Sequence, residues 1–222
     1  MKHLAVINHQ DSFIYNLIQI LRQDCGTECT IYPYESLPIP HLTRYDGVIL
    51  SPGPGTTDDY PRSTALLQAI ALLPRPIPVL GICMGMQQIG VLYGGTLYQL
   101  PEPAHGAAHK IVWQRTMPEW NVQAGQEMQV GLYHSWALRL PVGTTPLCPD
   151  NSFPTGTCPD PPVVVDAYDP ANGAVMALHH PTLPFYGLQF HPESILTPGG
   201  RALIKQWIKS IQPPFSPSLK SH

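Results

Sequence analysis

The sequence predicts an α/β fold with a doubly wound, mostly parallel central sheet, flanking helices and a small antiparallel sheet at one edge. Two observations predict it: buried strand-like runs alternate with helical periodicities in the first half, and short alternating segments follow. A hydrophobic content of 43% over 222 residues is enough for the core of one domain. We expect that domain to span residues 1–211, with a flexible C-terminal tail over 212–222, where prolines and serines gather.

The first half alternates strands with helices. His3 to Asn8 is an apolar strand, and the face that repeats after it predicts a helix with Asp11 and Ser12 at its N-cap. That face consists of Phe13, Ile14, Leu17, Ile18 and Leu21. Later strands are expected at residues 28–32, 47–50 and 79–82, with helices at 63–73 and 86–92.

After Gly95 the pattern changes to short strands typical of an antiparallel edge. These are Lys110–Trp113, Gln129–Tyr133, Val163–Tyr168, Ala174–Leu178 and Tyr186–Phe190. Thr197 then caps a last helix with Pro198 at its first position. Its buried stripe is Leu203, Ile204, Trp207 and Ile208. The stretch Pro146 to Pro162 is rich in proline and cysteine and resembles an insertion.

Composition excludes several classes of function. Only 12% of residues are charged and the net charge is -3, with no basic patch for nucleic acid. No apolar run approaches the ~20 residues that cross a membrane, and the chain starts with a strand and not a signal peptide. Five unevenly spaced cysteines suggest neither a disulfide framework nor a metal site. A reducing cytoplasm fits best.

The stretch Pro78–Gln88 carries the strongest chemical signal. A buried strand runs into Cys83, a helix-like segment follows, and Gly81 and Gly85 flank the cysteine at two residues on each side. This spacing predicts a nucleophile elbow, a strand-to-helix turn too tight for side chains beside the nucleophile. The helix N-terminus under the sulfur favours the thiolate. The alternative is a buried structural cysteine, which is what most lone cysteines are.

A proline–glycine loop, Ser51-Pro52-Gly53-Pro54-Gly55, follows the preceding strand of the predicted sheet. Taken alone it indicates an ordinary turn. Functional groups gather at the carboxyl ends of strands in such a sheet, so the loop lies near the predicted elbow. It is then a candidate oxyanion site, with the N–H of Gly55 from the loop and the N–H of Met84 from the helix start as donors.

His191 and Glu193 form a candidate base and its orienting carboxylate. Residues two apart face the same side of an extended chain, and Pro192 keeps that chain extended. A cysteine nucleophile needs a base, and the base needs a carboxylate. Ten histidines offer rivals, and a structural or surface role is the expectation for a lone one. The cluster Tyr133-His134-Ser135-Trp136 could line a pocket, although alone it indicates an exposed loop.

At these motifs the sequence resembles the class I (triad) glutamine amidotransferases, over about residues 3 to 210. Gly81–Gln87 is similar to the family's cysteine motif, Ser51–Gly55 to its oxyanion loop and Phe190–Glu193 to its His–Glu element, in the family's order. Asp11–Leu17 and His191–Pro198 are similar to one branch, the small subunits (component II) of anthranilate synthase and aminodeoxychorismate synthase. The resemblance implies the family's flavodoxin-like fold and a glutamine amidotransferase domain.

The resemblance also implies a site. Cys83 would attack the side-chain amide of L-glutamine, His191 would shuttle the proton and Glu193 would orient His191. A γ-glutamyl thioester and ammonia result, and water then releases glutamate. The implied oxyanion donors are Gly55 and Met84. The implied glutamine contacts are Gly53, Pro54, Gly55, Gln87, Ser135 and Trp136. No metal or organic cofactor is implied.

The implied partner is a chorismate-binding large synthase subunit in a hetero-oligomer, since this chain is too short to contain one. The ammonia would serve the synthesis of anthranilate or of 4-amino-4-deoxychorismate, and the sequence does not choose between them. One alternative is a stand-alone cysteine hydrolase that acts on γ-glutamyl or peptide amides. Another is a non-catalytic scaffold subunit, against which the intact Cys83, His191 and Glu193 count.

Overall fold

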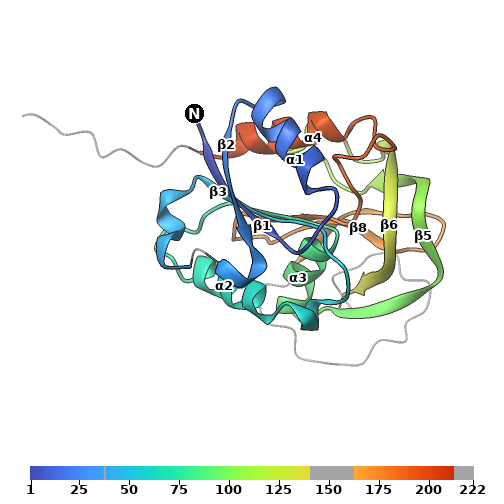
Figure 1. Cartoon of the computed structure of the whole chain (residues 1–222). Helices are drawn as coiled ribbons and strands as arrows, with labels where there is room; N and C mark the ends of the chain where they lie inside the picture. The colour runs from blue at the N-terminus through green and yellow to red at the C-terminus, as the bar shows by residue number, and fades with distance from the viewer. Residues whose placement is uncertain (38, 141–162, 213–222) are drawn as a thin grey trace, which may run out of the picture.

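The computed structural model describes residues 1–37, 39–140 and 163–212. Within these residues, nine strands form one mixed sheet in the order β2-β1-β3-β4-β9-β8-β7-β5-β6 (Figure 1). The strands are β1 (His3–Asn8), β2 (Glu28–Pro33), β3 (Gly47–Leu50), β4 (Val79–Ile82), β5 (Thr96–Trp113), β6 (Glu127–Arg139), β7 (Val164–Tyr168), β8 (Val175–His179) and β9 (Phe185–Leu188). The helices are α1 (Ile14–Gln19), α2 (Pro61–Ala71), α3 (Met84–Leu92) and α4 (Gly200–Ser210). Short helical turns are η1 (Ile20–Asp24), η2 (Tyr34–Ser36), η3 (Ile39–Arg44) and η4 (Thr57–Asp59).

The predicted fold class is confirmed, with one correction to its edge. Strands β2, β1, β3, β4 and β9 are parallel to one another, as a doubly wound sheet requires. The antiparallel strands do not form a separate small sheet. They continue the same sheet through β8, which pairs antiparallel with β9. The segment predicted at Tyr186–Phe190 was wrongly assigned to the antiparallel edge, because its strand β9 lies beside β4 and runs parallel to it.

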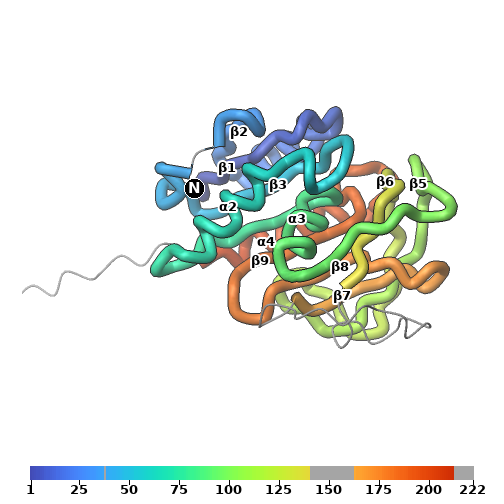
Figure 2. The backbone as a smooth tube through the Cα atoms, turned by 90° about the horizontal axis from the view of Figure 1, so that it is seen from below, coloured from blue at the N-terminus to red at the C-terminus, as the bar shows by residue number. Residues whose placement is uncertain are grey.

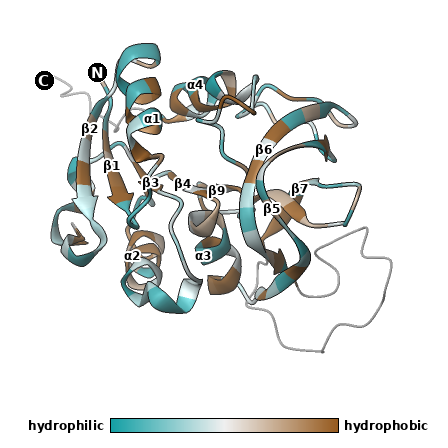
Figure 3. Cartoon of the chain, turned by 45° about the vertical axis from the view of Figure 1, so that its right-hand side comes forward, coloured by the Kyte–Doolittle hydropathy of each residue, from teal (hydrophilic) through white to brown (hydrophobic). Residues whose placement is uncertain are grey.

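Helices cover both faces of the parallel half of the sheet. Helices α1 and α4 lie on one face and α2 and α3 on the other, and Figure 2, seen from below, places α2 and α3 in front. Alternate residues of a strand point to opposite faces, so Leu4 and Val6 join the core under α1 and α4, whereas Ala5 and Ile7 join the core over α2 and α3. The central part of strand β1 is accordingly hydrophobic in Figure 3.

The predicted buried stripe of the last helix is confirmed. Helix α4 places these side chains in the core beside α1, and all four are at most 5% exposed: Leu203, Ile204, Trp207 and Ile208.

Two predicted helix caps are wrong for a shared reason, since each side chain serves a neighbouring loop. Asp11 Oδ1 accepts a hydrogen bond from the Phe13 N–H at 3.0 Å, which makes a turn, and α1 starts only at Ile14. The Thr197 hydroxyl donates to the His191 carbonyl at 2.7 Å, and α4 starts only at Gly200.

Two predictions lie outside the described residues. They are the insertion at Pro146–Pro162 and the tail beyond Gln212. In the described part of the chain, none of the helices combines the length and apolarity that a membrane span needs.

Candidate active site

Three loops meet at the carboxyl edge of the parallel strands. Ser51 follows β3, Cys83 follows β4, and the segment from Gln189 to His191 follows β9. Strand β4 lies between β3 and β9, so its end is central. The Cys83 N–H donates to the Leu188 carbonyl at 2.7 Å, which ties the cysteine to the end of β9. The sheet order therefore gathers the three motifs that are far apart in sequence.

Cys83 has the backbone of a nucleophile elbow. Its φ of 52° is a conformation that residues other than glycine rarely adopt, and it ends β4 so abruptly that α3 begins at the next residue, two positions earlier than predicted. A Cβ on Gly81 would lie 2.3 Å from the Gly85 carbonyl oxygen, and a Cβ on Gly85 would lie 2.5 Å from the Leu50 carbonyl oxygen. Both flanking glycines are thus required by close backbone approach, as the spacing predicted.

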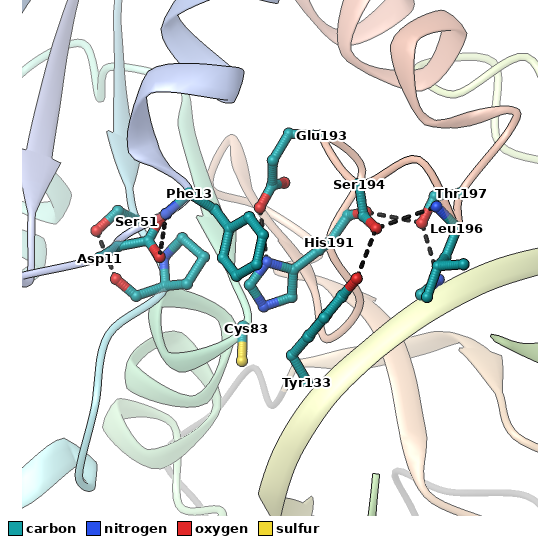
Figure 4. A network of polar contacts seen from close by, with 12 residues as sticks. Asp11, Phe13, Ser51, Cys83, Tyr133, His191, Glu193, Ser194, Leu196 and Thr197 are labelled. Atoms are coloured by element: carbon teal, nitrogen blue, oxygen red, sulfur yellow. Dashed lines mark hydrogen bonds and ion pairs between the residues drawn. The ribbon is translucent and has the colours of Figure 1, made fainter. Parts of the chain in front are cut away.

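His191 and Glu193 form a buried pair. The His191 Nδ1 lies 2.6 Å from Glu193 Oε1, and the two side chains are 4% and 0% exposed (Figure 4). Because the Glu193 carboxylate is bound at Nδ1, the ring nitrogen of His191 that remains free is Nε2. The prediction that His191 and Glu193 project together is confirmed by this contact.

Aromatic rings hold the imidazole in place. The ring of Phe13 lies 5.6 Å from the His191 ring and that of Tyr133 lies 5.0 Å from it, both edge-on. The Tyr133 hydroxyl also lies 3.0 Å from the Ser194 hydroxyl, as Figure 4 shows. The His191 side chain thus has little freedom to leave the carboxylate.

The charge state of His191 is set by its neighbours. Burial by itself would lower its pKa, but the adjacent Cys83 sulfur and the Glu193 carboxylate favour the protonated ring and raise the pKa from 6.5 to about 10. These partners therefore favour the protonated imidazole. An imidazolium beside the sulfur is the arrangement that stabilises a thiolate.

His9 packs against the predicted oxyanion loop, Ser51–Gly55, and supports it. This side chain is fully buried: its backbone N–H donates to the Ser51 hydroxyl at 2.9 Å, and its Nε2 lies 2.7 Å from the Ser63 hydroxyl. A Cβ on Gly53 would lie 2.6 Å from the His9 carbonyl oxygen, so only glycine fits there. The Tyr60 hydroxyl donates to the Pro54 carbonyl at 2.9 Å. Gly55, with a φ of +80°, completes the loop.

The burial of His9 predicts a pH-dependent stability. Burial lowers the pKa of His9 from 6.5 to about 4, and a hydrogen bond with Ser51 offsets only part of this. The neutral form is favoured in the folded chain, so its stabilisation is complete above pH 6.5 and is lost as pH falls toward 4. Between pH 7 and pH 5 we expect the unfolding free energy of His9→Gln to fall by about 2 kcal/mol less than that of the native chain, because the variant has no imidazole at this position to protonate on unfolding.

Urea unfolding at both pH values measures this difference. Other groups also titrate in this range, so the comparison is between the two proteins and not between the two pH values alone. Equal losses of unfolding free energy in the native chain and in His9→Gln would contradict the assignment.

One cavity of about 220 Å³ collects the predicted pocket residues. Every predicted site residue except His191 and Glu193 lines it, namely Gly53, Pro54, Gly55, Cys83, Met84, Gln87, Ser135 and Trp136. The composition of the Tyr133-His134-Ser135-Trp136 cluster alone suggested an exposed loop, and this was wrong. The cluster lies on β6, where His134 is buried and its neighbours are partly buried. In the described residues, no group of three or more His, Cys, Asp or Glu side chains is placed to hold a metal.

Sequence reasoning missed several residues of this site. Phe13 packs on the His191 ring, His9 supports the oxyanion loop, and Gln189 lies against the sulfur. His105 also lines the cavity, and its Nε2 lies 2.9 Å from the Ser135 hydroxyl oxygen. The one available signal was position, since Phe13, His9 and Gln189 each follow the carboxyl end of a strand in the parallel sheet.

Comparisons with known proteins agree with this geometry. The sequence profile of the family "Glutamine amidotransferase class-I" matches residues 5–211. Anthranilate synthase component 2 of Mycobacterium tuberculosis is 32% identical over 213 residues, which cover 92% of this chain and 81% of that protein. A protein of Azospirillum brasilense named anthranilate synthase is 34% identical over 206 residues, which cover 90% of this chain and 24% of that protein.

Among solved structures, a glutamine amidotransferase from Methylobacillus flagellatus matches with a TM-score of 0.69 and 14% identity, over 97% of this chain and 96% of that one. At that identity the match speaks for the fold alone. The family profile spans nearly the whole chain and includes all three loops of the site. The chain therefore belongs to the class I glutamine amidotransferases, the enzyme family that its three motifs predicted.

Proposed function

We propose that this enzyme hydrolyses L-glutamine with Cys83 as nucleophile, His191 as proton carrier and Glu193 as the carboxylate that orients His191. The observation that carries the proposal is the meeting of a strained cysteine elbow with a buried His–Glu pair at one cavity. This arrangement supplies a nucleophile, a base and an orienting group, as covalent amide cleavage requires.

The first half-reaction forms a thioester. The Cys83 thiolate attacks the carboxamide carbon of glutamine, and the C=O electron pair moves onto the oxygen. The N–H groups of Gly55 and Met84 would bind that oxyanion, since Met84 is the first residue of α3 and its N–H has no partner within the helix. When the C–N bond breaks, the protonated His191 gives its proton to the leaving nitrogen, and ammonia departs.

The second half-reaction regenerates the enzyme. Neutral His191 removes a proton from water, the hydroxide adds to the γ-glutamyl thioester, and the C–S bond breaks. Glutamate leaves, and the starting thiolate and imidazolium are restored. Glu193 keeps the Nδ1–H in place through both halves and stabilises the charged ring, without itself taking the proton.

Gln87 gives the cavity a group that can bind the amino-acid end of glutamine. The Gln87 amide nitrogen donates to the Trp136 carbonyl at 2.9 Å and to Gln189 Oε1 at 3.0 Å. We therefore assign its carbonyl oxygen to the substrate, where it would accept from the α-ammonium. Gly53, Pro54, Ser135 and Trp136 complete the proposed glutamine contacts along the same cavity.

We further propose that the ammonia serves a chorismate-using synthase subunit and that the product is anthranilate. The names of the curated relatives support this choice over aminodeoxychorismate. The A. brasilense relative supports a close association, because there the matching segment is 24% of a longer chain named anthranilate synthase. A cytoplasmic location is part of the proposal, since a catalytic thiolate persists in a reducing compartment.

The test is reconstitution with the large subunit from the same source. We expect the two chains to copurify and to convert chorismate and glutamine into anthranilate, identified by chromatography and mass spectrometry. Aminodeoxychorismate as the product would contradict the proposed pathway but not the proposed glutaminase activity. Full-rate cleavage of γ-glutamyl peptides by this chain alone, with no synthase partner retained, would instead favour a stand-alone hydrolase.

A further inference from the structure

We propose that the Gln189 side chain is a second polar partner of the Cys83 sulfur and stabilises its thiolate form. The inference deepens the proposed function, since it takes Cys83 as the nucleophile. The Gln189 amide nitrogen lies 3.4 Å from Cys83 Sγ, which is within hydrogen-bond reach of a sulfur acceptor. The residue is fully buried directly after β9, at the point where the Cys83 backbone is tied to that strand.

The orientation of the Gln189 amide follows from a fixed backbone acceptor. The Trp136 carbonyl can only accept, so Gln87 must present its amide nitrogen there, at 2.9 Å. The same Gln87 nitrogen lies 3.0 Å from Gln189, which must therefore present its carbonyl oxygen. The other end of the Gln189 amide is then an N–H donor, and it is the end that meets the sulfur.

One property distinguishes this donor from His191. An amide N–H has no proton to give up near neutral pH, so it stabilises the negative sulfur throughout the pH range of the enzyme. Hydrogen bonds to charged groups are stronger than those between neutral groups, so the contact favours the thiolate over the thiol. The thiolate is also the leaving group when the thioester is hydrolysed, so the same contact assists the second half-reaction.

Gln189 is held in this position from the cavity wall. A chain of hydrogen bonds runs from the Trp136 carbonyl through Gln87 to Gln189 and ends at the sulfur. The Trp136 carbonyl is itself fixed by His134, whose Nδ1 lies 2.8 Å from it. The wall that lines the substrate cavity is thus connected to the nucleophile by side chains that are buried or partly buried.

The test is the rate of Cys83 alkylation by iodoacetamide as a function of pH, on the full chain without glutamine. Mass spectrometry of the peptide that contains Cys83 separates its signal from those of the other cysteines. Gln189→Leu removes the donor. We expect its alkylation midpoint to rise by about one pH unit, and the rate below that midpoint to fall ~10-fold.

Gln189→Glu is the second variant. It keeps the length of the side chain and an acceptor for Gln87, but turns an oxygen toward the sulfur, so we expect a larger shift in the same direction. Gln114→Leu is the matched control, because it removes a partly buried glutamine amide outside the cavity, and its profile should match that of the native chain. Circular dichroism reports whether each variant is folded.

Profiles of Gln189→Leu and Gln189→Glu that coincide with the native one would overturn the proposal. If Gln189→Leu does not fold, the comparison rests on Gln189→Glu alone. Alkylation needs no glutamine turnover, so the proposed function is judged separately. A chain with no glutaminase activity but with shifted profiles would retain the role of Gln189 and lose only the substrate assignment.

Discussion

Cys83→Ala is expected to abolish glutamine-dependent synthesis by the complete enzyme while ammonia-dependent synthesis continues. The variant removes the sulfur that forms the thioester, and loss of the nucleophile from a comparable triad lowers kcat by about 10⁶. Free ammonia bypasses this chain, since it reaches the synthase subunit without hydrolysis. Product formation from chorismate, with glutamine or with an ammonium salt as the nitrogen source, measures both activities in one preparation.

Cys25→Ala is the matched control for Cys83→Ala. Cys25 is a half-buried free thiol that is not among the residues lining the cavity, so its loss should leave both activities unchanged. A diazoketone analogue of glutamine adds a second readout, with a covalent adduct on Cys83 in the native chain and none in Cys83→Ser. Loss of both nitrogen sources in a folded Cys83→Ala complex would contradict the division of labour between the subunits.

The parallel half of the fold was predictable because its signals are local. A strand covered on both faces needs a continuous apolar run, and β1, β3 and β4 each carry one at the predicted residues. The place of β9 was not predictable in this way. Its four residues resemble a short edge strand, and only the pairing with β4 reveals it as part of the parallel sheet. Strand order is a tertiary property, so periodicity does not encode it.

The same contrast holds within the site. The elbow was visible in sequence because two glycines at fixed offsets record a close backbone approach. His9 and Gln189 left no such record, since a buried histidine or glutamine gains its role from partners far away in the chain. His9 meets Ser63 and Gln189 meets Cys83, across 54 and 106 residues respectively. The failed cap at Thr197 follows the same rule, because its hydroxyl is engaged by the site loop.

His191→Ala is expected to lower the glutaminase kcat more than Glu193→Ala does. In a serine-protease triad, loss of the base costs about 10⁶ in kcat and loss of the orienting carboxylate about 10⁴. The physical reason applies here: His191 transfers the proton, whereas Glu193 fixes and stabilises the ring through its 2.6 Å contact. The edge-on rings of Phe13 and Tyr133 would still hold His191 when the carboxylate is absent.

Glu193→Gln separates orientation from charge. Its amide keeps the size of the side chain and an oxygen that can accept from Nδ1–H, but it carries no negative charge to stabilise the imidazolium. The pKa of His191, which its partners raise to about 10, should therefore move back toward 6.5. Since the protonated ring delivers the proton to the leaving nitrogen, the alkaline limb of kcat/KM should shift to lower pH. An unshifted alkaline limb, or equal and complete loss in His191→Ala and Glu193→Ala, would show that these two residues do not have the separate roles assigned to them.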